Sequence, residues 1–198
     1  MTNPVMIVAR LYEHVEPIDR GERYEDPLDD ALKGAGLGTV TGGGSQLGEL
    51  GEIEFADVEI EVANVDAALP VIIEHMERAG APVGSELLME GGAVKVFGAQ
   101  QSVAVYLDGV SLPDDVYANL DFGVTVDQLT SAAGEGSFHG FWQGAEETGL
   151  FFFGSDAEAV WSRLEPVLSA MPIGQNARIV VRPARDAARH RTVRLPRH

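Results

Sequence analysis

The sequence lacks cysteine altogether, which excludes disulfide bonds, thiol catalysis and thiolate metal sites. It also lacks an apolar run as long as the ~18–20 residues that a membrane-spanning helix needs. Residues 1–5 show no basic segment leading into a long apolar stretch, which is how a secretory signal begins. These absences predict a cytoplasmic protein of bacterial type that has no contact with a membrane.

Basic residues are few for a chain of this length, and half of them lie at one end. Of the 198 residues, 14 are lysine or arginine and 31 are aspartate or glutamate, so the net charge is −17. Residues 1–177 hold 30 of the acids but only 7 basic residues, whereas residues 178–198 hold seven arginines and one acid. Nucleic acid is not an expected partner, because this acidic body would repel phosphates.

The arginine-rich end, residues 183–198, is expected to form a basic tail that docks on the protein's own acidic body. Docking on the acidic body of a neighbouring subunit is the second interpretation. An arm that binds nucleic acid is the third, and the charge of the body makes it the weakest.

Apolar and turn-forming residues predict alternating strands and helices in the first half of the chain. Asp26 is the expected N-cap of the first helix, and a change in alternation predicts a β-bulge near Ala56 and Asp57, with Phe55 in the core. The expected elements are, in order, a strand at 5–12, a polar loop at 13–25, a helix at 26–34, strands at 38–42 and 52–62, a helix from Asn64 or Asp66 to Ala79, and strands at 86–90 and 94–97.

The second half repeats the same order of elements and even some of its residues. Its expected elements are a strand at 102–107, a helix at 126–133, strands at 136–140 and 150–153, a helix at 156–170 and a strand at 178–181. Eight positions are identical at offsets of 98 or 90 residues, and they pair Asp29 with Asp127, Gly36 with Gly134, Gly38 with Gly136, Gly42 with Gly140, Asp66 with Asp156, Ala67 with Ala157, Pro82 with Pro172 and Gly84 with Gly174. Residues that set turns and helix ends are shared, so the two copies are expected to share a backbone plan.

The order β-α-β-β-α-β resembles the ferredoxin-like fold. The resemblance implies an α+β protein made of two ferredoxin-like βαββαβ units, which are related by internal duplication and pack about a pseudo-two-fold axis. The units are expected at residues 1–98 and 99–182. Ferredoxin-like units serve as metabolite sensors, RNA binders, enzymes and interaction modules, so the resemblance assigns no function.

Two groups of residues are candidates for binding a ligand. The expected loop before the first helix carries Arg20, Arg23 and Tyr24, and Arg10 lies on the strand that leads to it. In tandem ferredoxin-like metabolite sensors the corresponding loop contributes to ligand binding, so the resemblance implies a site for a small anion. The alternative is that these arginines form ion pairs with neighbouring acids, which contribute little at a surface.

The second group is His139 and Trp142, with Glu146 and Glu147 close behind them. A histidine and a carboxylate can perform general acid–base chemistry, although a packed histidine is the competing interpretation. No serine has the G-x-S-x-G setting of a hydrolase nucleophile, so catalysis is not expected. The histidine and acids at 14–19 match no metal-binding spacing, and neither a metal nor a cofactor is expected.

The glycines at 42–44 are followed by Ser45 but lack the Gly-Lys-Ser/Thr ending of a phosphate-binding loop. They are therefore expected to form a hairpin connection at 42–48. The aromatic run at 151–153 is too bulky and apolar for a strand with one solvent-exposed face. It therefore predicts that the strand is buried on both faces or lies at a subunit contact.

Composition favours a non-catalytic acidic protein that binds a basic protein partner, for example an immunity or inhibitor protein directed against a basic toxin or nuclease. The alternative is a small-molecule sensor or weak enzyme whose site lies at the junction of the two units. A homodimer without a ligand is the third hypothesis.

Overall fold

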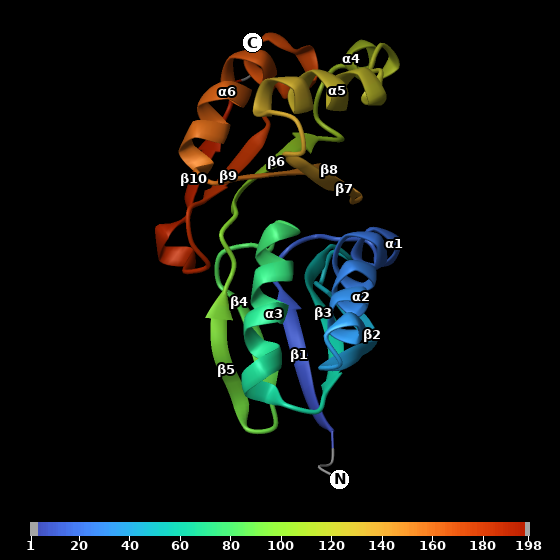
Figure 1. Cartoon of the computed structure of the whole chain (residues 1–198). Helices are drawn as coiled ribbons and strands as arrows, with labels where there is room; N and C mark the ends of the chain where they lie inside the picture. Colours follow the sequence, from blue (N-terminus) through green and yellow to red (C-terminus); the bar gives the residue numbers. More distant parts are fainter. Residues whose placement is uncertain (1–3, 197–198) are drawn as a thin grey trace. The chain divides into compact units, whose positions relative to one another are not determined.

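The computed structural model describes residues 4–196 and divides the chain into two compact units, residues 1–100 and 101–198 (Figure 1). Each unit is a five-stranded antiparallel sheet with helices between its strands. Among the described residues, no helix is both long enough and apolar enough to cross a membrane.

The first unit has the strand order β2-β3-β1-β4-β5. Its hairpin between β4 and β5 turns at Gly91 and Gly92, whose φ angles of 103° and 121° suit glycine. The elements are β1 (Val5–Leu11), α1 (Pro17–Arg20), the π-helix η1 (Gly21–Glu25), α2 (Asp26–Gly34), β2 (Gly38–Leu47), β3 (Ile53–Val62), α3 (Val65–Arg78), β4 (Ser85–Met89) and β5 (Gly92–Phe97).

The strand order of the second unit, read in the same direction as that of the first, is β7-β8-β6-β9-β10. Each strand therefore has a counterpart at the same position in the first sheet. The elements are β6 (Gln101–Asp108), α4 (Asp114–Ala118), α5 (Phe122–Ala133), β7 (Phe138–Gln143), β8 (Glu147–Gly154), α6 (Ala157–Ala170), η2 (Pro172–Gly174), β9 (Arg178–Arg182), η3 (Ala187–Arg189) and β10 (Arg191–Arg194). Four adjacent strands of each sheet, β2-β3-β1-β4 and β7-β8-β6-β9, have the ferredoxin-like order, and β5 and β10 each add one further strand at the edge. The α+β fold with two repeated units is thereby confirmed, whereas their pseudo-two-fold packing stays a prediction.

The helices of each unit cover one face of its sheet, where the core lies. In β1 the residues Ile7, Ala9 and Leu11 are fully buried against α2 and α3, and the residues between them lie on the opposite face. In β8 Phe152 joins the helix-side core, while Phe151 and Phe153 lie on the other face together with Ala104. All three phenylalanines are buried, as the sequence predicted.

The expected polar loop at 13–25 is wrong from residue 17 onward. Helical structure begins at Pro17, whose fixed φ suits the first position of a helix, and continues through η1 into α2. Asp26 is consequently inside the helical segment and caps nothing. The buried stripe of this segment is Arg20, Tyr24, Leu28 and Leu32. Because the stripe begins with a charged residue, the apolar period that indicates a helix was not recognisable in the sequence.

The expected hairpin connection at 42–48 is also wrong, because β2 continues through the glycines to Leu47. A Cβ atom at Gly43 would lie 2.5 Å from the Asp57 carbonyl oxygen and 2.8 Å from Glu25 Oε1. The glycine therefore allows the helical segment to approach the strand closely.

The β-bulge of β3 lies at Glu54, because Gln46 pairs with Phe55 whereas Leu47 pairs with Ile53. It was expected two residues later. The earlier position sends Phe55 to the sheet face away from the helices, where it contacts Tyr12, so its expected place in the core is wrong.

Candidate functional site

Arg20 is buried between the helical segment and strand β2. Its Nε atom donates to Glu25 Oε1 over 2.5 Å, and its Nη1 atom donates to the Gly44 carbonyl and to Ser45 Oγ. Through these bonds the guanidinium joins the end of α1 to the glycine-rich strand β2, and only 8% of Arg20 is exposed. It has little surface left for a ligand.

Tyr24 and Arg23 both face the Glu13 carboxylate, whose side chain is fully buried. The Tyr24 hydroxyl donates a hydrogen bond to Glu13, and an Arg23 nitrogen lies 3.7 Å from it. Burial, and then the charge of Glu13, raise the pKa of Tyr24 far above its ordinary value. The tyrosine is therefore a neutral donor that satisfies a buried carboxylate.

Arg10 lies on the opposite face of the same sheet from Arg20. It donates two hydrogen bonds of 2.8 Å to Asp57 and stacks 3.8 Å above the Phe55 ring. The hydrogen bonds to Asp57 raise the pKa of Arg10. The arginines that the sequence grouped together thus lie on two faces of a sheet, and each faces a carboxylate of its own.

His139 and Trp142 both belong to β7 in the second unit. The His139 ring stacks on Phe153 with 4.2 Å between ring centroids and 20° between planes. Trp142 lies over Gly144, where an added Cβ would be 2.2 Å from the indole. Both side chains join the aromatic packing on the sheet face that carries Phe151, and His139 is 9% exposed.

The described residues contain no cluster of three or more histidine, aspartate or glutamate side chains that would suit a metal ion. His14 accepts a hydrogen bond from the Ile53 amide at Nδ1, and its Nε2 atom lies 3.4 Å from Glu16. The histidine therefore joins the segment after β1 to the start of β3.

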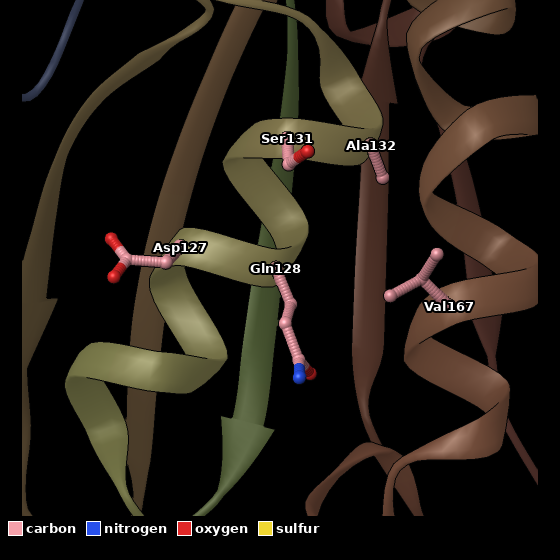
Figure 2. A pocket seen from close by; sticks show the side chains of 5 residues that line it. All are labelled: Asp127, Gln128, Ser131, Ala132 and Val167. Atoms are coloured by element: carbon pink, nitrogen blue, oxygen red, sulfur yellow. The ribbon is translucent and has the colours of Figure 1, made fainter.

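A surface groove on the helical side of the second unit emerges only in the structure. Its first part is a shallow cavity of about 530 Å³ beside α5 and α6, lined by Asp127, Gln128, Ser131, Ala132 and Val167. Figure 2 shows Val167 projecting from α6 toward α5, while Asp127 points away from α6 on the outer flank of α5.

The second part of the groove is a cavity of about 340 Å³ that shares Gln128 with the first. It extends from α5 to α4 and to η2, and Val124 in its wall is 49% exposed. Its lining residues are Asp115, Val116, Asn119, Leu120, Asp121, Val124, Thr125, Gln128, Met171, Pro172 and Ile173. Together, the two cavities form what we call the α5 groove.

The sequence of α5 explains why one of its sides stays open. The Asp121 side chain accepts from the Val124 amide and starts the helix, and Thr125, Leu129 and Ala133 then bury one stripe against the sheet. Gln128 lies outside this stripe and therefore faces solvent.

The α5 groove is apolar at its base and acidic at its rim. Asp115, Asp121 and Asp127 are exposed, and the residues that line the two cavities include no lysine or arginine. Sequence reasoning missed this site, although its signal was visible as acids that alternate with Val116, Leu120 and Val124.

Neither a protein-family model nor a curated protein matches the sequence. Among solved structures, a "putative monooxygenase" from Fusobacterium nucleatum is 12% identical to this chain, with a TM-score of 0.30. The alignment covers 91% of this chain and 92% of the monooxygenase chain. An "unknown protein" from Galdieria sulphuraria is 13% identical, with a TM-score of 0.30, and the alignment covers 92% of this chain and 98% of that chain. A "putative monooxygenase" from Lactobacillus acidophilus is 12% identical, with a TM-score of 0.26, and the alignment covers 98% of this chain and 99% of that chain. Such low identities and TM-scores support no particular activity.

Proposed function

We propose that the protein binds a basic protein partner through the α5 groove. The observation that carries this proposal is the combination of an apolar base with a rim of Asp115, Asp121 and Asp127 that holds no positive charge. Removal of the apolar base from water favours association, and only the part that exceeds the entropic cost of binding contributes to affinity. The carboxylates select partners of opposite charge.

The charge of the whole chain supports the same partner class. A net charge of −17 accelerates the encounter with a basic protein and repels acidic competitors. An immunity or inhibitor protein directed against a basic toxin or nuclease is one concrete form of this function. A small-molecule site built on Arg20 and Arg23 has less support, because both guanidinium groups already face carboxylates.

The test compares two variants that lose the same number of charges. One carries Asp115→Asn, Asp121→Asn and Asp127→Asn in the groove, where asparagine at 121 still serves as a helix cap. The control carries Asp19→Asn, Asp30→Asn and Asp66→Asn, three exposed positions of the first unit. Basic host proteins captured by the full chain are identified, purified and titrated against all three proteins at several salt concentrations.

The groove variant is expected to bind at least about tenfold more weakly than the control, with a shallower salt dependence. Equal binding by both variants would show that the charge of the whole chain, and not the groove, attracts the partner. The complete absence of salt-sensitive binding by the unaltered chain would contradict the proposed function itself.

A further inference from the structure

The two cavities of the α5 groove follow one another along a single helix. The α5 side of the smaller cavity is formed by Val124, Thr125 and Gln128 after the Asp121 cap, and that of the larger cavity by Asp127, Gln128, Ser131 and Ala132. At a rise of ~1.5 Å per residue, the centres of the two sets lie ~6 Å apart along the α5 axis. The groove thus offers two neighbouring apolar sites at a fixed spacing.

The walls of the groove decide which backbone conformation can lie in it. They are formed by α4, α5, α6, η2 and the short connections at residues 119–121 and at Met171, with no strand among them. A helix bonds its backbone groups within itself, so these walls offer no row of free amides and carbonyls for an extended peptide. A helical ligand brings its backbone already satisfied and packs its side chains between those of α5 and α6.

From this geometry, and resting on the proposed function, we infer that the partner docks an amphipathic α-helix whose two apolar anchors are one turn apart. Positions i and i+4 of a helix lie ~6 Å apart along its axis, close to the spacing of the cavities. One anchor enters the cavity beside Val124 and Ile173, and the other enters the cavity beside Val167.

The acidic rim sets where the helix carries its positive charges. Asp115 and Asp121 line the cavity next to α4, and Asp127 flanks the other one. An arginine or lysine one turn beyond the first anchor would therefore meet Asp115 or Asp121, and one next to the second anchor would meet Asp127 on the outer flank of α5. Arginine is the better choice, because its planar guanidinium can bind a carboxylate with two hydrogen bonds.

The inference is tested on the full chain with three synthetic, fluorescently labelled peptides. The first is an alanine-based helix with two leucines one turn apart, one arginine one turn beyond the first leucine and one arginine next to the second leucine. The second has the same composition with the leucines moved to opposite faces, and the third has a central proline that breaks the helix. Binding is followed by fluorescence anisotropy at physiological salt.

Two tryptophan variants of the chain locate the binding. Ser131→Trp places a large side chain in the larger cavity, whereas Ser162→Trp makes the same change on an exposed part of α6 outside the groove. The first peptide is expected to bind the unaltered chain and Ser162→Trp alike, and to bind Ser131→Trp about tenfold more weakly. Circular dichroism melts check that both variants are folded.

Three results would overturn the inference: equal binding of all three peptides, equal binding to both tryptophan variants, or no peptide binding to a chain that still binds basic host proteins through its groove acids. Each leaves the proposed function standing, because a basic partner of another shape would then fill the groove. If neither the peptides nor basic host proteins bind, the proposed function fails as well.

Discussion

The guanidinium group of Arg20 lies directly over Gly43, so an added Cβ at position 43 would be 3.0 Å from the Arg20 Nε atom. The neighbouring Gly44 has open space on the corresponding side. Two adjacent glycines of one strand thus have different roles, and only the first is required by packing.

Gly43→Ala is expected to destabilise the first unit by ~2 kcal/mol, because the methyl group would meet the Asp57 carbonyl and the Arg20–Glu25 ion pair. Gly44→Ala is the matched control, and its effect should stay within ~0.5 kcal/mol. Urea unfolding of both variants measures the difference. Equal stabilities would mean that Arg20 can move away from the strand at no cost.

Tyr24 makes the stability of the protein sensitive to alkaline pH. Its pKa is raised by burial and by Glu13, so the folded state keeps the hydroxyl protonated where an unfolded tyrosine ionises, near ~10. The stabilising contribution is complete below that pH and is lost as the pH rises above it. Tyr24→Phe should therefore flatten the decline of stability at alkaline pH, even though the variant is less stable at neutral pH. An unchanged slope would contradict the buried pair.

Asp29 has the opposite dependence on pH. Hydrogen bonds from Lys33, from the Thr39 hydroxyl and from the Val40 amide lower the pKa of Asp29 to about 2. Its contribution to stability is present above the unfolded pKa of ~3.9 and is lost as the pH falls toward about 2. A carboxyl titration followed by NMR should place the midpoint of Asp29 well below the ~3.9 of an ordinary aspartate, and Asp29→Asn should weaken the loss of stability in acid. A midpoint of Asp29 near ~3.9 would count against these hydrogen bonds.

The order of elements was largely readable from the sequence, because the central strands and most helices bury a regular apolar stripe. Strand β8 and helix α6 begin and end within a few residues of their expected bounds, and Asp156 caps α6 as its position suggested. The repeat was less reliable for the helix caps. Asn64 caps α3, so Asp66, which aligns with Asp156 in sequence, lies in the first turn of the helix and is not its cap.

The errors occurred where a side chain from elsewhere in the chain decides the local structure. The buried stripe of the helical segment before Asp26 starts with a charged residue. Arg20 is tolerated there only because Glu25 and the Gly44 carbonyl of β2 accept its hydrogen bonds. The glycine-rich strand likewise has no reason to be a strand until Arg20 is placed against it. Neither relationship has a period or motif that a sequence pattern could reveal.

The α5 groove could not be predicted for a similar reason. Val167 and Ile173 come from parts of the chain some forty residues after α5, and only the packing of α6 and η2 brings them beside Val124 and Gln128. The acids of the rim and the apolar residues beside them on α4 and α5 are visible in the sequence, but nothing there shows that Val167 and Ile173 complete the groove. Composition indicated only the negative charge of the chain itself.

The arginine-rich end of the chain has a place in the fold that bears on how the protein would be shortened. Strand β10 pairs with β9 through four residues, and Leu195 behind it is 8% exposed and belongs to the core. A chain cut after Arg182 would thus lose an edge strand and leave the apolar residues of β9 at the border of the sheet. Trypsin should accordingly cleave readily at the exposed Arg185 and Arg189, but slowly at Arg194, where the sheet must first open. The most basic stretch of this acidic protein thus supplies the edge strand that protects β9 of the second sheet from opening.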